Sequence, residues 1–141
     1  VRKVGTTPRV GLLSLSNFGS ARTRDSDKVA EASRLLHANE PDLEVDGEMM
    51  AETALSPEIL KSRYPFSRLQ ERANVLICPN LSAGNIAYQL LKRLGGAEAI
   101  GPILVGMAKP AHILQRDVDV QDAVNMAVIA AVDAQERAAR R

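Results

Sequence analysis

The stretch V-G-L-L-S-L at residues 10–15 decides the fold class, because it is apolar with little polar alternation. A strand that is buried on both faces, as in a parallel sheet, has this pattern. The run N-V-L-I-C at 74–78 has the same character, and further apolar runs lie at 43–45 and 100–105. Flanking Pro, Asn and Gly residues favour strands over buried helical turns.

The intervals between these runs have helical periodicity. Helices are predicted over four ranges, 26–38, 57–62, 82–94 and 119–139: the second from a proline at its first turn, and the other three from the spacing of apolar residues. Ser82 is the expected N-cap of the third helix and Asp119 that of the fourth. Strands that alternate with helices predict an α/β fold with a mostly parallel sheet flanked by helices. Residues 1–8 are expected to be a lead-in and 64–72 a surface loop.

Composition narrows the class of function. The 141 residues fit one domain, and 18 Lys and Arg against 17 Asp and Glu give a net charge of +1. This charge provides no basic excess for nucleic acid, and the four aromatic residues are too few and scattered to form a base-stacking platform. The single cysteine, Cys78, excludes an internal disulfide and a cysteine-cluster metal site. No apolar run is long enough for a membrane span, so we expect a cytoplasmic protein without membrane or nucleic-acid partners.

Segments that follow strands are the candidate ligand sites, because ligands of open parallel sheets bind beyond the carboxyl ends of the strands. The loop Ser16-Asn17-Phe18-Gly19-Ser20 offers hydroxyls, an amide and backbone N–H groups that can cradle an anion, although polar capping explains such loops more often. Asp46-Gly47-Glu48 could bind a hydroxyl or a metal, but a turn with an unusual backbone angle at Gly47 is the favoured interpretation. Asn80 follows the third run.

The region before the last helix carries the best anion-binding side chain. Arg116 can hold a phosphate with two parallel hydrogen bonds, and Asp122 could act as a general base. Asp119 and Asp122 also resemble a capping box, so the two interpretations of Asp122 stay open. His37 and His112 are expected to be structural or solvent residues. Cys78 is expected to pack as a small apolar side chain.

Five stretches, taken in order, resemble the C-terminal half of the phosphate acetyl/butyryl transferase family. They are L-S-L-S-N-F-G-S (13–20), P-D-L-E-V-D-G-E-M (41–49), A-N-V-L-I-C-P-N-L-S-A-G-N-I-A-Y (73–88), G-G-A-E-A-I-G-P-I-L-V-G-M-A-K-P (95–110) and V-N-M-A-V-I-A-A-V-D-A-Q (124–135). The resemblance implies transfer of acetyl between coenzyme A and phosphate. It also implies a fold like that of isocitrate and isopropylmalate dehydrogenases, with 9–141 as the second subdomain plus the final helix.

Several of these motifs resemble a fused form of the family, in which a malic enzyme precedes a transferase-like part. S-N-F-G-S at 16–20 stands where free-standing transferases tend to read S-T-K-G-S, and D-G-E-M at 46–49 and K-P-A-H-I-L at 109–114 also resemble the fused form. The resemblance implies an N-terminal malic enzyme part that is missing from this chain. It also implies NADP and Mg or Mn for that parent, with no cofactor and no metal in this segment.

The resemblance also implies roles for the residues near the last helix. In the family a Ser-Arg pair helps bind phosphate and the acyl carbonyl, and an Asp six residues later is the candidate base for the thiol. Arg116 and Asp122 keep two of these groups, whereas Gln115 replaces the Ser and Phe18 replaces the loop Lys. One lost oxyanion donor can cost about 10²–10³ in rate. These departures predict no catalysis, with Gln115, Arg116 and Asp122 as vestigial candidates.

The sequence therefore favours a regulatory segment of an NADP-dependent malic enzyme that binds acetyl-CoA or a related acyl-CoA and is itself inactive. The expected ligand-binding residues are Ser16, Asn17, Gly19, Ser20, Asn80, Arg116 and Asp122. The first alternative is an active phosphate acetyltransferase. The second is a structural dimerisation module, since the family implies a homo-oligomer and the last helix is rich in valine.

Overall fold

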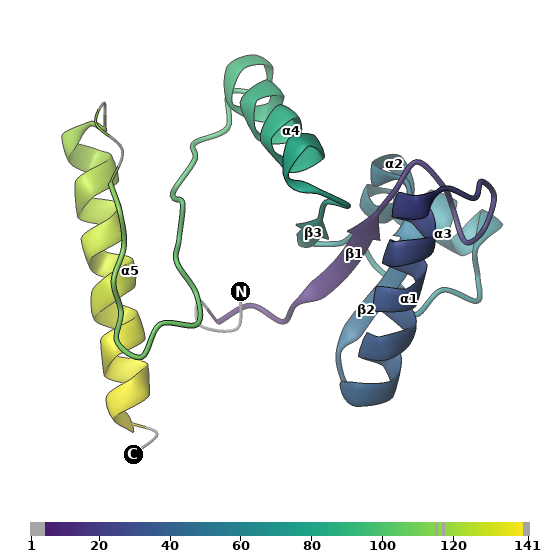
Figure 1. Cartoon of the computed structure of the whole chain (residues 1–141), viewed down its shortest axis with the longest axis horizontal. Helices are drawn as coiled ribbons and strands as arrows, with labels where there is room; N and C mark the ends of the chain where they lie inside the picture. Colours follow the sequence, from purple (N-terminus) through teal and green to yellow (C-terminus); the bar gives the residue numbers. More distant parts are fainter. Residues whose placement is uncertain (1–4, 115, 117, 140–141) are drawn as a thin grey trace. The chain divides into compact units, whose positions relative to one another are not determined.

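The computed structural model describes residues 5–114, 116 and 118–139. Gln115, a predicted site residue, and positions 1–4 of the expected lead-in lie outside the described residues. The chain divides into two compact units, Val1–Leu90 and Leu91–Arg141. Figure 1 labels the elements along the chain.

A three-stranded parallel sheet forms the centre of the first unit. Its strands are β1 (Arg9–Leu13), β2 (Glu44–Met49) and β3 (Val75–Ile77), in the spatial order β2-β1-β3. Both pairings are parallel, with Val10 opposite Val45 on one side and opposite Val75 on the other. The predicted α/β class with a parallel sheet is confirmed. All three strands overlap the apolar runs from which they were predicted.

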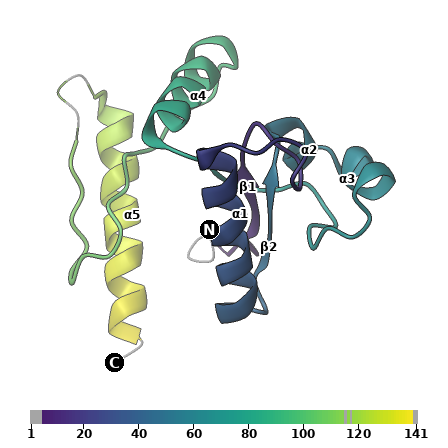
Figure 2. The ribbon, with the colours of Figure 1, turned by 45° about the vertical axis from the view of Figure 1, so that its right-hand side comes forward.

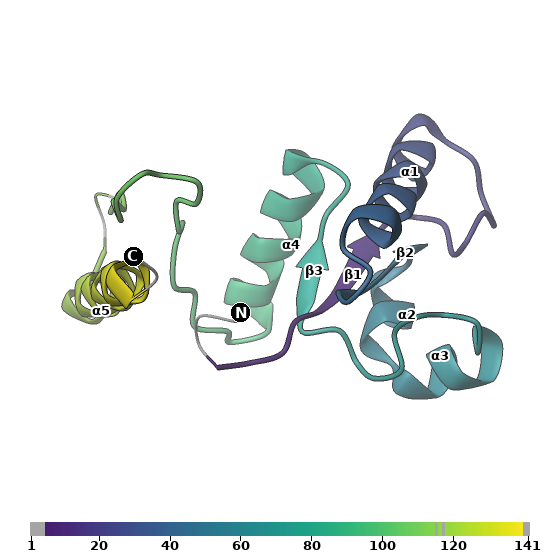
Figure 3. The ribbon, with the colours of Figure 1, turned by 90° about the horizontal axis from the view of Figure 1, so that it is seen from below.

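Helices cover both faces of this sheet. α1 (Arg24–Asn39) lies on one face, and α2 (Ala51–Leu55) and α3 (Pro57–Arg63) lie on the other, as Figure 3 shows from below. α1 and α3 confirm their predicted ranges, whereas α2 was not predicted, since five residues are too few for a periodic pattern. In Figure 2, α2 follows directly on the end of β2.

The alternation of side chains along β1 supplies two apolar clusters. Val10 and Leu12 pack with Val29 of α1 and Val45. Leu13 points to the other face and packs in a second cluster with Met49, Ala54, Leu60, Leu69 and Ala73. Cys78 packs against this second cluster, as predicted.

The segment 64–72 has no helix or strand, as predicted, but it does not lie wholly on the surface. Leu69 is only 1% exposed and belongs to the second apolar cluster, and Ser67 is also buried. The expectation of a surface loop is therefore wrong for these two residues. The Leu69 side chain is buried because it packs against side chains of the sheet and of α3 and so fills space in the core.

The second unit contains α5 (Val120–Ala139) and the end of α4 (Leu81–Leu94). Both helices confirm their predicted ranges. The run at 100–105, expected to be a strand, forms none. Pro102 lies inside this run, and a proline cannot donate the backbone hydrogen bond that a ladder needs. Among the described residues, no helix is both long and apolar enough to cross a membrane.

Candidate functional site: the strand-end loop and the segment before the last helix

The loop after β1 is bound to the end of β2. Ser16 is fully buried, and its Oγ donates to Oε1 of Glu48 at 2.8 Å. The backbone N–H of Gly19 donates to the same oxygen at 2.6 Å, and that of Phe18 donates to the Glu48 carbonyl at 2.8 Å. Glu48 is 4% exposed. The two donors that the sequence offered to an external anion therefore already hold a carboxylate of the chain itself.

The other polar groups of the loop close it further. The Asn17 amide oxygen accepts from the Met50 N–H at 2.8 Å, and the Asn17 N–H donates to Ser20 Oγ at 2.9 Å. The Ala21 N–H donates to Ser16 Oγ at 3.0 Å. The structure thus brings the four predicted loop residues together, with their polar groups engaged mostly by one another and by the end of β2.

The sequence did not predict that Glu48 contacts the loop after β1, although the structure places its carboxylate there. The segment 46–49 was expected to be a turn, and that expectation is wrong, because it forms the last four residues of β2. The unusual angle at Gly47 is confirmed, with φ of +148°. A Cβ there would meet the Leu12 carbonyl oxygen at 2.5 Å, so the strand passes β1 closely only with glycine. The parallel pairing of β1 with β2, which brings their carboxyl ends together, is the signal that could have found Glu48.

Asp46 has a structural role beside this site. It is 6% exposed, and its Oδ2 accepts from Ser67 Oγ at 2.9 Å and from the Arg68 N–H at 2.7 Å. The His37 Nε2 lies 2.9 Å from the Val45 carbonyl oxygen and 3.6 Å from Asp46 Oδ1. His37 is therefore half-buried against β2 and has a structural contact there. A carboxylate that is satisfied in this way anchors the loop 64–72 to the sheet.

Three of the four aromatic residues gather beside the loop. The ring centroid of Phe18 lies 5.1 Å from that of Tyr64 and 5.0 Å from that of Phe66. The ring centroids of Tyr64 and Phe66 are 6.1 Å apart. Phe18 has a φ of +48°, which few non-glycine residues adopt. The expectation of scattered aromatic residues is therefore wrong for these three. Separations of 46 and 48 residues along the sequence hid a contact that the fold creates.

A cavity of about 480 Å³ opens next to the loop. Phe18, Gly19 and Glu48 line it from the loop and β2, and Arg22 and Asp27 line it from the start of α1. The Arg22 guanidinium already pairs with the Asp27 carboxylate at 3.2 Å. With that pair neutralised, the remaining charged group in the lining is the Glu48 carboxylate, and its sign is wrong for a phosphate.

Asn80 directly precedes α4, and both polar atoms of its side chain already have hydrogen-bond partners. Its Oδ1 accepts from the Ala83 N–H at 2.9 Å, which makes Asn80 the N-cap and makes the expected cap at Ser82 wrong. Its Nδ2 donates to Asp25 Oδ2 at 2.8 Å, and Lys28 Nζ lies 3.0 Å from Asp25 Oδ1. Hydrogen bonds from Lys28 and Asn80 hold the pKa of Asp25 below its usual value.

The second unit holds the remaining predicted residues. Arg116 is exposed, and Asp122 is half-buried at the start of α5. The Asp122 N–H donates to Asp119 Oδ1 at 2.8 Å, which confirms Asp119 as the N-cap. Asp122 also lines a cavity of about 260 Å³ together with Lys92, Asp119 and Asn125. Glu98 also lines this cavity, so the Asp122 carboxylate borders a partly enclosed space that has one cation and three carboxylates in its lining.

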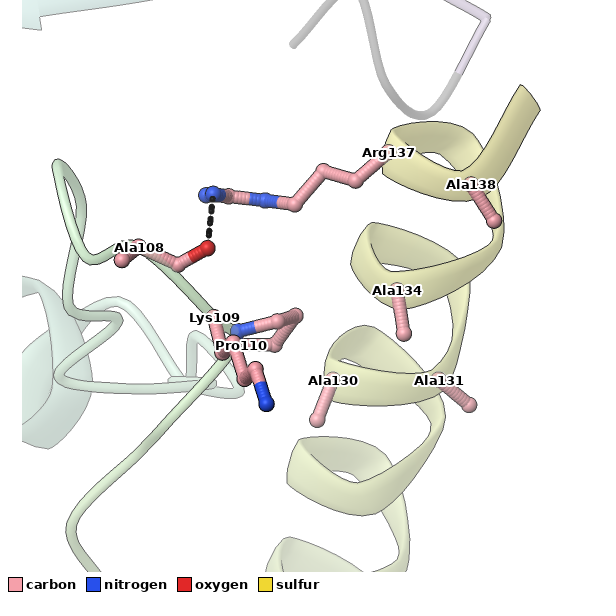
Figure 4. A pocket seen from close by; sticks show the side chains of 8 residues that line it. All are labelled: Ala108, Lys109, Pro110, Ala130, Ala131, Ala134, Arg137 and Ala138. Atoms are coloured by element: carbon pink, nitrogen blue, oxygen red, sulfur yellow. Dashed lines mark hydrogen bonds between the residues drawn. The ribbon is translucent and has the colours of Figure 1, made fainter. Parts of the chain in front are cut away.

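A larger cavity, of about 630 Å³, lies along the other end of α5 (Figure 4). On the helix it is lined by four alanines and Arg137, and Lys109 is the other charged residue in the lining. The Arg137 guanidinium donates to the Met107 carbonyl at 2.7 Å and to the Ala108 carbonyl at 3.3 Å. These bonds hold the segment 107–110 to the helix. Among the described residues, no cluster of three or more His, Cys, Asp or Glu side chains could hold a metal ion.

The fold and these loops define an α/β domain with polar groups at the carboxyl ends of its strands. The family described as phosphate acetyl/butaryl transferase matches residues 1–131. The chain belongs to this family.

Relatives of two kinds match with similar identity. A phosphate acetyltransferase of Acetivibrio thermocellus is 46% identical over 94% of this chain and 40% of its own length. An NADP-dependent malic enzyme of Escherichia coli is 44% identical over 96% of this chain and 18% of its own length. The chain therefore spans about two fifths of the first relative and less than one fifth of the second.

The solved structures agree with the fold. A phosphotransacetylase from Streptococcus pyogenes superimposes with a TM-score of 0.89 at 37% identity, over 96% of this chain and 41% of the other. The EutD phosphotransacetylase from Staphylococcus aureus has a TM-score of 0.86 at 39% identity, over 94% and 42%.

Proposed function

We propose that this chain binds acyl-coenzyme A and contributes to the transfer of acetyl between coenzyme A and inorganic phosphate. The observation that carries the proposal is the likeness of more than nine tenths of the chain to phosphate acetyltransferases and phosphotransacetylase structures. These matches support transfer better than the regulatory function that the sequence favoured. The proposal extends to the isocitrate dehydrogenase-like two-subdomain arrangement, of which this chain supplies part.

In the proposed reaction, Asp122 and Arg116 have separate tasks. The carboxylate of Asp122 takes the proton of the coenzyme A thiol, whose ordinary pKa is about 8.5. The thiolate sulfur forms a bond to the acetyl carbon, the bond from that carbon to the phosphate oxygen breaks, and phosphate leaves. The Arg116 guanidinium binds the phosphate oxygens. Support for these tasks is the half-buried carboxylate in a cavity with Lys92, and the exposed guanidinium six residues earlier.

Acetyl phosphate formation from acetyl-CoA and phosphate tests this proposal in the full chain. We expect Asp122→Asn to lower the rate by about 10²–10⁴ and Arg116→Ala to weaken phosphate binding. Asp42→Asn, an exposed turn residue, is the matched control and should keep the rate. A full rate in Asp122→Asn would remove this carboxylate from the reaction.

A second candidate function is a non-catalytic segment that binds acetyl-CoA and regulates an NADP-dependent malic enzyme. Phe18 favours it, because this ring lies in the aromatic cluster where a free-standing transferase tends to have a lysine. Regulation would arise from different affinities of acetyl-CoA for two states of the larger protein. NADP and Mg or Mn would serve that larger protein, and their binding groups would lie outside this segment.

Calorimetric titration with acetyl-CoA, combined with the transfer assay, separates the two candidates. Binding with turnover supports the transferase, and binding without turnover supports the regulatory segment. In the regulatory case Arg116→Ala should weaken binding by about 1.5–3 kcal/mol, whereas Asp122→Asn should change it less, since the thiol need not ionise. A homo-oligomer in the cytoplasm remains a prediction for both, and sedimentation and cell fractionation test it.

A further inference from the structure

We propose that the loop Ser16–Ser20 is an anion cradle that the chain fills with its own carboxylate, that of Glu48. The inference rests on the geometry of this loop alone and does not require acetyl transfer. It makes Glu48 a positioning residue, and it makes the loop unavailable to an external phosphate while Glu48 is in place.

The first support is that two hydrogen-bond donors of the loop converge on one oxygen of Glu48. Glu48 Oε1 accepts from Ser16 Oγ at 2.8 Å and from the Gly19 N–H at 2.6 Å. A hydroxyl and a backbone N–H that converge on one oxygen form the arrangement with which loops before helices bind phosphate. Here the ligand oxygen comes from a neighbouring strand.

The second support is the burial of this carboxylate without a cation. Glu48 is 4% exposed, and none of the ion pairs between described residues includes it. A buried carboxylate is costly unless hydrogen bonds compensate it. The donors of the loop supply this compensation, so the loop and the charge hold each other in place.

The consequence concerns where ligands bind. A phosphate that approached the loop would meet the Glu48 charge and would find both donors occupied. The loop instead fixes Phe18 through the bond from its N–H to the Glu48 carbonyl, and thereby sets one wall of the 480 Å³ cavity. Under the proposed function, the phosphate therefore binds away from this loop.

Removal of the carboxylate tests the proposal directly. In Glu48→Ala the Gly19 N–H loses its acceptor, and the Ser16 hydroxyl keeps only the 3.4 Å contact to Ser20 Oγ, so a small carboxylate from solution should take the vacated place. Titration of the full chain with acetate or formate, followed by the amide resonance of Gly19, should show saturable binding in this variant. The unaltered chain should show no saturable shift at Gly19 with acetate or inorganic phosphate.

If Glu48→Ala is too unstable for this titration, its stability provides the readout. Acetate, but not chloride at equal ionic strength, should then raise the unfolding midpoint of Glu48→Ala. Two further variants serve as comparisons. Glu48→Gln retains an acceptor oxygen and should remain folded without acetate binding at Gly19. Glu44→Ala, on the same strand but without a contact to the loop, is the matched control and should not respond to acetate.

Three results would overturn the proposal. They are saturable phosphate binding at Gly19 in the unaltered chain, saturable acetate binding in Glu48→Gln, and no acetate effect on either the resonance or the stability of Glu48→Ala. None of these outcomes depends on coenzyme A or on turnover, so failure of this proposal is distinguishable from failure of the proposed function.

Discussion

The two compact units differ in what happens to their apolar side chains. In Val1–Leu90, Val45, Met49 and Leu60 are at most 1% exposed, in clusters that fill both faces of the sheet. In Leu91–Arg141, Leu94 is 81% exposed, and the valine stripe of α5 is 36–82% exposed. Both units have amphipathic helices, so the difference teaches that periodicity specifies a helix but not the surface that buries it.

The strongest test of this comparison is the truncation of one leucine in each unit. Leu60→Ala should cost about 2–5 kcal/mol, because it leaves a cavity among closely packed side chains. Leu94→Ala should change the free energy of unfolding by less than about 0.5 kcal/mol, because the side chain is exposed. Urea denaturation measures both. Equal costs would contradict the contrast between the two units.

The irregular segment 64–72 of the first unit provides a second test. The loop 64–72 is anchored by the Asp46 carboxylate, which Ser67 and Arg68 contact. Asp46→Asn places an amide where an acceptor is needed and should cost about 1.5–3 kcal/mol. Asp42→Asn, which is exposed, should cost little. Equal stability of both variants would show that this carboxylate does not anchor the loop.

The start of α4 provides a third and smaller test, because this helix begins in the first unit although it buries none of its own residues. Asn80→Ala removes the N-cap and should cost about 1 kcal/mol. Ser82→Ala should leave stability unchanged or raise it slightly, since alanine favours helix. Thermal unfolding followed by circular dichroism compares the two. A larger cost for Ser82→Ala would reinstate the cap that the sequence predicted.

The smallest expected effect concerns pH at the contact between Asp25 and Asn80. Lys28 and Asn80 lower the pKa of Asp25, so its folded-state pKa lies below its value in the unfolded chain. The contribution to stability is therefore present above about pH 4 and is lost as pH falls through the folded pKa. Asp25→Asn should reduce stability slightly at pH 7, and this reduction should shrink as pH falls below about 4. A difference that persists unchanged at pH 2 would contradict the ionic origin of this contact.

Much of the fold was predictable from local pattern. The three strands were predicted from short apolar runs, α1, α4 and α5 from helical spacing, and α3 from Pro57 at its first turn. The strand proposed at 100–105 failed, since apolar content alone does not provide a ladder partner and Pro102 lacks a donor. α2 was missed because one and a half turns contain too few residues for a period to be recognised.

The candidate site was also only partly predictable from the sequence. The sequence identified Ser16–Ser20, Asn80, Arg116 and Asp122 by their positions after strands and before helices. It did not identify Glu48 as the partner of the loop, although it quoted the residue in D-G-E-M. A separation of 32 residues between Ser16 and Glu48 gives no sign of a hydrogen bond until β1 and β2 pair in parallel.

The sequence by itself determined the α/β class, the parallel sheet and the family, because these depend on hydropathy and on motifs read along the chain. The tertiary structure alone decided that Phe18 meets Tyr64 and Phe66, that Asp46 holds a loop, and that Glu48 fills the cradle next to it. The physical reason is that local pattern sets which face of an element is apolar. Only the register between elements decides which polar groups share a buried space and satisfy one another.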